Sequence, residues 1–238
     1  RSQSSHAQVA MSRTITIATT VTGQSVECTL DRLALIVVDM QRDFLDPQAF
    51  YVQTMDENNG DEIRSCIPEV TKLVDASRGA GVQIVFTREG HEPDLSDLDD
   101  SKRFRYDEAG TGIGGATALG RLLVRGEPGH GFIEQLTVEE RDIIIDKAGQ
   151  DAFWGTDLEA KLKEKGITHV LVCGVTAGTC VQSTLRGASD RGFYAAIVAD
   201  AVGAFREEDR KRAVEMVDSE NGAIGFIAST SALCREMA

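Results

Sequence analysis

The sequence lacks the features that would place this chain in a membrane or in a low-complexity class. No run of about 18 consecutive apolar residues exists, so we expect no segment that spans a bilayer. Gly and Pro number only 23 and 4 among 238 residues, which excludes collagen-like and disordered chains. With 42% hydrophobic and 26% charged residues, the composition predicts one globular domain with a large core.

Basic residues are fewer than acidic ones, and the cysteines show no pairing pattern. The 25 Lys and Arg residues face 38 Asp and Glu residues, which gives a net charge of −13. Such a surface repels phosphate backbones and anionic lipid, so we expect neither nucleic acid nor membrane as a partner. The five cysteines are odd in number and show no CxxC pair or zinc-type spacing. We therefore predict free thiols and a cytoplasmic location.

Short β-branched runs alternate with helical patterns along the chain. We predict strands at 33–38, 82–87, 141–146, 169–174, 193–199 and 223–228, and helices at 63–79, 158–165, 179–191 and 207–217. Strands joined by helices of this length form right-handed crossovers. The pattern predicts an α/β fold, a doubly wound and mostly parallel six-stranded sheet with helices on both faces.

The chain divides into an arm and one domain. We interpret residues 1–30 as an N-terminal arm, in which residues 1–10 are candidates for cloning-derived sequence, and residues 31–238 as a single domain. Residues 88–135 are too long for a plain connection, so we interpret them as an excursion across the site mouth or a subunit contact. An irregular surface loop fits this composition equally well.

Three chemically reactive residues follow predicted strands. Asp39 follows the first strand, Lys147 follows the third, and Cys180 lies in a Gly-containing turn after the fourth. Ligands bind at the carboxyl ends of parallel strands, so the three side chains are expected at one edge. The helix start after the turn favours a thiolate and supplies N–H groups for an oxyanion. Each of these residue types alone commonly has a structural role. The hypothesis of a reactive site therefore rests on their expected position at the same edge of the sheet.

Three spaced motifs resemble a known family. They are residues 35–44, then Lys147 with Phe153, Gly155 and Thr156, then residues 174–181. Together and in this order they resemble the isochorismatase-like cysteine hydrolases. The resemblance implies an Asp39–Lys147–Cys180 catalytic triad and an oxyanion hole formed by the backbone N–H groups of Thr176 and Cys180. It also implies a cis peptide bond before Thr176 and no cofactor.

Further stretches at 87–95, 112–114, 120–129 and 145–147 are similar to the biuret hydrolase branch of that family. This implies cleavage of a C–N bond in a small linear amide or ureide through a thioester. The candidate substrate-binding residues are Phe44, Glu89, Phe153, Trp154 and Asn221. Residues 56–58 lack the histidine of the nicotinamidase branch, so we expect no metal. Relatives commonly form dimers or tetramers, so we expect a homo-oligomer.

Two other functions stay open on the sequence. One is an isochorismatase-type vinyl ether hydrolase, which does not need the cysteine. The other is a non-catalytic family member that acts as an interaction module.

Overall fold

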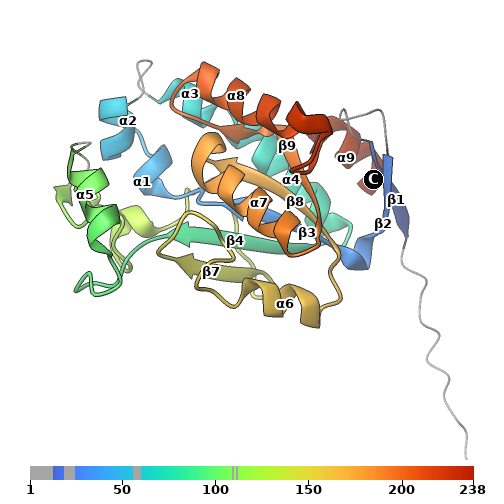
Figure 1. Cartoon of the computed structure of the whole chain (residues 1–238), viewed down its shortest axis with the longest axis horizontal. Coiled ribbons are helices and arrows are strands. Elements are labelled where there is room, and N and C mark those ends of the chain that lie inside the picture. The colour runs from blue at the N-terminus through green and yellow to red at the C-terminus, as the bar shows by residue number, and fades with distance from the viewer. Residues whose placement is uncertain (1–12, 19–24, 56–59, 109, 111) are drawn as a thin grey trace, which may run out of the picture.

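A six-stranded parallel sheet forms the centre of the protein (Figure 1). The computed structural model describes residues 13–18, 25–55, 60–108, 110 and 112–238. In spatial order the strands are β10 (Phe226–Ala228), β9 (Tyr194–Gly203), β8 (His169–Val175), β3 (Leu33–Val38), β4 (Gln83–Glu89) and β7 (Ile143–Lys147). Every neighbouring pair in this sheet is parallel, which confirms the predicted fold class.

Helices cover both faces of the sheet because its inner strands are apolar on both sides. The odd-numbered residues of β3 pack into one core and its even-numbered residues into the other. Helices α4 (Ile67–Gly79) and α9 (Thr230–Met237) contribute to the first core. Helices α6 (Leu158–Glu164), α7 (Gln182–Asp190) and α8 (Glu207–Asp218) contribute to the second.

The order of the strands reverses beside β3. From β3 the chain builds β4 and β7 on one side, then returns to place β8, β9 and β10 on the other. A crevice opens at the carboxyl ends of strands where the order reverses in this way. The register pairs Val38 with Gly174 and Glu89 with Lys147, so the residues that end these strands lie next to one another.

Two predicted helices differ from their expected form. The helix expected over 63–79 is divided into α3 (Asp61–Arg64) and α4, and Pro68 stands in the first turn of α4, where proline is tolerated. The helix expected over 179–191 begins as a π-helical turn, η3 (Ala177–Val181), and continues as α7. The π turn sets the orientation of the residues between β8 and α7.

The N-terminal segment that was expected to be an arm contains secondary structure. Within the expected arm, β1 (Thr14–Ala18) and β2 (Ser25–Thr29) form an antiparallel pair whose Ile15 and Ile17 are buried beside α9. Residues 1–12 lie outside the described residues. Among the residues that the structure describes, no helix is long and apolar enough to cross a bilayer.

The excursion of residues 88–135 is not a plain loop. It holds α5 (Asp100–Glu108), a small ladder of β5 (Ala116–Thr117) and β6 (Gly120–Arg121), and the 3-10 turn η2 (Pro128–His130). Near it lie α1 (Arg42–Leu45) and α2 (Phe50–Met55), which follow β3 (Figure 1). Side chains of α5 line the cavity described next, so this segment forms part of its wall.

Candidate active site

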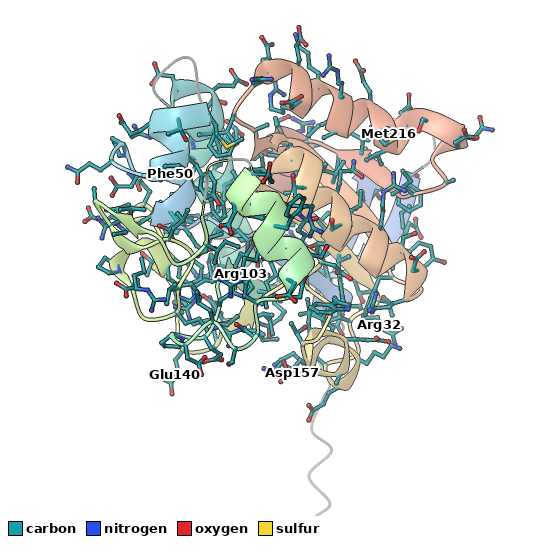
Figure 2. All side chains as sticks on the ribbon, turned by 60° about the vertical axis from the view of Figure 1, so that its left-hand side comes forward. Arg32, Phe50, Arg103, Glu140, Asp157 and Met216 are labelled. Atoms are coloured by element: carbon teal, nitrogen blue, oxygen red, sulfur yellow. The ribbon has the colours of Figure 1, made fainter. Side chains whose placement is uncertain are left out.

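A cavity of about 1010 Å³ lies at the carboxyl edge of the sheet. Figure 2 views this side of the molecule, with α5, which carries Arg103, in front and α8, which carries Met216, above it. The apolar part of the wall includes Phe44, Tyr51, Met55, Phe205 and Met216. The Phe44 and Tyr51 rings stack with centroids 5.4 Å apart, so two elements after β3 hold one side of the cavity together.

Asp39 and Lys147 form a fully buried ion pair next to Glu89 and Cys180, two residues that line this cavity. Asp39 directly follows β3 with φ of 48°, a left-handed conformation that aspartate tolerates better than most residues. The Thr87 hydroxyl donates to its Oδ1 at 2.6 Å, and Lys147 Nζ lies 2.7 Å from its Oδ2. Lys147 Nζ also donates to the Gly149 carbonyl at 3.0 Å. The carboxylate and the ammonium are therefore fixed before any ligand binds.

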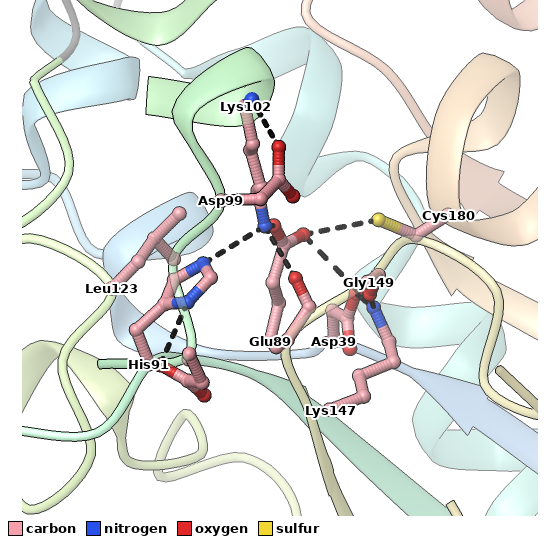
Figure 3. Close-up of polar contacts among 12 residues, drawn as sticks. Asp39, Glu89, His91, Asp99, Lys102, Leu123, Lys147, Gly149 and Cys180 are labelled. Carbon is pink, nitrogen blue, oxygen red and sulfur yellow. Dashed lines mark hydrogen bonds and ion pairs between the residues drawn. The ribbon is translucent and has the colours of Figure 1, made fainter. Parts of the chain in front are cut away.

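Cys180 lies in η3 with its thiol between two carboxylates (Figure 3). Its Sγ donates to Glu89 Oε2 at 3.3 Å and also hydrogen-bonds Asp39. The side chain is buried but faces the cavity, as does Thr176, which follows a cis peptide bond from Val175. The cis bond implied by the family resemblance is thus confirmed.

Burial and charge set the protonation of this cluster. Burial raises the pKa of the Cys180 thiol well above its ordinary value, and Glu89 and Asp39 raise it further against the opposing effect of Lys147. This direction runs against the thiolate that the helix start was expected to favour. Burial also raises the pKa of Asp39, although Lys147 opposes this. Burial alone would lower the pKa of Lys147, but Asp39, Cys180 and Glu89 outweigh it and raise the pKa.

Glu89 is the second buried carboxylate of the site and stands at the end of β4. Burial would raise its pKa, but Lys147 and Lys102 together overcome this and lower it. Lys147 Nζ lies 4.0 Å from Glu89 Oε2, and Lys102 Nζ lies 2.6 Å from Oε1. The two ammonium groups therefore favour the ionised form of Glu89.

The oxygen and sulfur atoms of Asp39, Glu89 and Cys180 lie within 4.8 Å of one another. Three such groups resemble a set of metal ligands by distance alone. The ammonium groups of Lys147 and Lys102 already neutralise both carboxylates, so the cluster does not present the net negative charge that a divalent cation needs. Residues 56–58, on which the expectation of no metal rested, lie outside the described residues.

The structure places the five candidate substrate-binding residues in different surroundings. Phe44 and Glu89 line the cavity, whereas Phe153, Trp154 and Asn221 are not among its lining residues. Phe153 is buried against Phe193 in the second core, Trp154 is 63% exposed, and Asn221 is exposed in the turn after α8. These three side chains therefore lie outside the cavity lining, because motif order along the chain does not fix the direction of a side chain.

Lys102 is a site residue that the sequence did not reveal. It is buried beside Glu89 although it belongs to a helix of mostly charged residues. No sequence signal distinguishes it from the exposed charges around it, because a lysine in such a segment is normally solvated. The fold of the excursion turns this one side chain inward.

Comparisons with known proteins identify the family of this chain. The family model described as the isochorismatase domain matches residues 33–228. The chain is 25% identical to the ureidoacrylate amidohydrolase RutB of Azorhizobium caulinodans, over 84% of this chain and 88% of that protein. It is 30% identical to RutB of Methylorubrum extorquens, over 72% and 69%.

A solved cysteine hydrolase from Pseudomonas syringae pv. phaseolicola shares the fold. It superposes with a TM-score of 0.73 at 24% identity, and the match covers 88% of this chain and 94% of that one. The family model spans β3 to β10 and therefore the whole central sheet, together with Asp39, Glu89, Lys102, Lys147 and Cys180. The chain belongs to the isochorismatase domain family.

Proposed function

We propose that this protein is a cysteine hydrolase that cleaves a C–N bond in a small linear amide or ureide. The observation that carries this is the buried Cys180 thiol facing the cavity between Asp39 and Glu89, with Lys147 bound to Asp39. Nucleophile, proton acceptor and cation stand within contact distance, which is the arrangement that nucleophilic catalysis requires. Relatives named as amidohydrolases support the same reaction class.

The reaction begins with transfer of the Cys180 proton to Asp39. The raised pKa of Asp39 suits it to accept this proton, while Glu89 is held ionised by two lysines. The sulfur attacks the carbonyl carbon, and the N–H groups of Thr176 and Cys180 hold the resulting oxyanion. Donors of this kind contribute roughly 3–4 kcal/mol each to stabilising the transition state.

The C–N bond then breaks and the leaving nitrogen takes the proton from Asp39. A thioester between substrate and Cys180 remains. Water attacks this thioester, the S–C bond breaks, and the proton returns to the thiol. Lys147 balances the charge of Asp39 whenever that carboxylate is ionised, so the buried site stays near neutral through both halves.

We propose biuret-like ureides as substrates on the family resemblance, with ureido acids as a second candidate. Arg105, Arg186, Arg206 and Arg212 line the cavity, which favours a substrate with an anionic end. The named relatives that act on ureidoacrylate point the same way. Both classes carry the same ureide group toward Cys180, so the chemistry is common to them.

Turnover of a substrate panel tests this function. Ammonia release would be measured with biuret, ureido acids, carbamoyl amino acids and nicotinamide. Cys180→Ser and Asp39→Asn are expected to lower kcat by about 10³-fold or more while the proteins stay folded, because each removes a reacting group. Cys28→Ser is the control, since that thiol packs in the first core away from the cavity.

Two results would contradict the proposal. Cleavage of isochorismate that survives Cys180→Ala would identify a vinyl ether hydrolase. A folded protein that turns over no member of the panel and forms no covalent adduct at Cys180 would identify a non-catalytic interaction module.

A further inference from the structure

Lys102 is a buried lysine that the reaction steps above do not use. Its side chain comes from α5, in the excursion, and is 5% exposed. Nζ donates to Glu89 Oε1 at 2.6 Å and to the Ala148 carbonyl at 2.6 Å, and lies 3.0 Å from His91 Nε2 (Figure 3). Three acceptors match the three N–H groups of an ammonium, so this amine is a charged donor and not a nucleophile.

The contact with Lys102 fixes the protonation of His91. Because Nε2 accepts a hydrogen bond from Lys102, the ring proton lies on Nδ1 and is donated to Asp97 Oδ1 at 3.1 Å. Burial and the nearby Lys102 cation lower the pKa of His91, which keeps the ring neutral. A continuous chain of hydrogen bonds thus runs from Asp97 through His91 and Lys102 to Glu89.

Glu89 is held by contacts with Gln41, Lys102 and Cys180. Gln41 accepts its backbone N–H at 2.7 Å and donates to its carbonyl at 2.9 Å, which fixes the main chain at the end of β4. Lys102 occupies Oε1 of the side chain, so Oε2 is the oxygen that faces Cys180. A buried charge with so many partners has one orientation, because breaking any contact leaves a polar group unsatisfied.

We propose that Lys102 is a positioning residue that fixes the Glu89 carboxylate on the cavity wall as an acceptor for the N–H groups of the substrate. The inference rests on the proposed function and names the chemistry of one substrate contact. Amide and ureide nitrogens carry N–H donors, and an ionised carboxylate only accepts. A protonated Glu89 would present an O–H donor to those groups and would lose this complementarity.

A double-mutant cycle distinguishes positioning from simple stabilisation of α5. Lys102→Met removes the charge but keeps the apolar stem, and we expect kcat/KM to fall about 10- to 100-fold. In a Glu89→Gln background the same change should alter kcat/KM by less than about twofold, since no carboxylate is left to position. If the losses in kcat/KM of the two single variants multiply in the double variant, the proposal is overturned. Arg103→Met, one residue along α5 and outside the cavity lining, is the matched control.

A second readout does not depend on turnover. The Glu89 carboxyl carbon can be followed by ¹³C NMR across pH and assigned by its loss in Glu89→Gln. We expect Lys102→Met to raise the Glu89 pKa by about 1–3 units and Lys102→Arg to leave it low. An unchanged Glu89 pKa in Lys102→Met would refute the positioning role.

The two proposals can fail separately. If the wild-type protein hydrolyses nothing in the panel, the proposed function fails, while the titration still decides whether Lys102 controls Glu89. If Lys102→Met does not fold, Lys102→Gln is used in its place for the same kinetic and NMR measurements. Glutamine removes the charge but still offers N–H donors. A folded Lys102→Gln with wild-type kcat/KM would also overturn the inference.

Discussion

Asp43 is a buried carboxyl near the site whose charge costs stability. It lies in α1, and its Oδ2 accepts the Leu123 N–H at 3.0 Å. Burial raises its pKa from 3.8 to about 6, with only partial opposition from the Leu123 N–H and Arg42. A carboxyl with a raised pKa in the folded state stabilises the fold below its unfolded pKa. That stability is lost as the pH rises through about 6.

Asp43→Asn should remove this pH dependence. The amide oxygen still accepts the Leu123 N–H, but no proton is lost at high pH. We expect the variant to gain on the order of 2–3 kcal/mol relative to wild type between pH 4 and pH 8. Urea unfolding at both pH values measures this. Asp75→Asn, on the exposed side of α4, controls for the loss of one charge. An equal difference at both pH values would show that Asp43 titrates normally.

At the residue scale, the sequence located site residues only where a chemically reactive side chain follows a predicted strand. Asp39, Lys147 and Cys180 each follow a predicted strand, so the expected convergence at one edge required only the order of the strands. Trp154 lies beyond β7 in a loop, where backbone conformation and not strand order directs the side chain. The pKa of Cys180 was beyond prediction because it depends first on the burial of the thiol, and then on charged neighbours from other strands.

At the scale of elements, the close contact of β3 and β8 determines where the site residues stand. Gly174 has φ of 105°, and a Cβ there would lie 2.2 Å from the Val38 carbonyl oxygen. The pairing of β8 with β9 shifts register between Val172 and Gly174, as bulges near active sites often do. The absent side chain lets β8 approach the residue before Asp39.

Gly174→Ala is therefore expected to be damaging. The added methyl meets main-chain atoms and the positive φ disfavours alanine, so we expect a loss of about 2–4 kcal/mol in the free energy of unfolding. Turnover should also fall, because Asp39 and Thr176 flank this contact. Denaturant unfolding and kcat measure the two effects. Gly79→Ala meets nothing within 4 Å and should leave both nearly unchanged. Wild-type stability in Gly174→Ala would contradict the contact as described.

The predicted elements were those with a strong apolar pattern. All six strands of the sheet were predicted because their residues are buried on both faces or follow a regular spacing. Helix α5 was not, since its sequence is mostly charged and Lys102 is the one residue of the helix that is buried. The β1–β2 pair was also unpredicted, because each strand has only five residues and a pattern this short carries little signal without its partner.

At the scale of the whole molecule, positive charge gathers at the cavity of an acidic protein. The chain carries a net charge of −13, yet arginines from α5, α7 and α8, together with Arg206 just before α8, line the cavity. Arg212 pairs with Glu208, whereas Arg105, Arg186 and Arg206 contact no carboxylate within the part of the chain that the structure describes. A local positive rim on an acidic surface attracts small anions to this one place.

This distribution of charge predicts a preference between the two candidate substrate classes. A ureido acid should have a lower KM than biuret, and its KM should rise with ionic strength because salt screens exposed charges, whereas the KM for neutral biuret should not. Replacing both Arg186 and Arg206 by Gln is expected to reduce the selectivity for the ureido acid by about 10-fold or more. Arg141→Gln, before β7 at the opposite edge of the sheet, removes a comparable exposed charge and should leave selectivity unchanged. If salt and the double substitution affect both substrates equally, the rim arginines do not select substrate charge, and the neutral ureide becomes the better assignment.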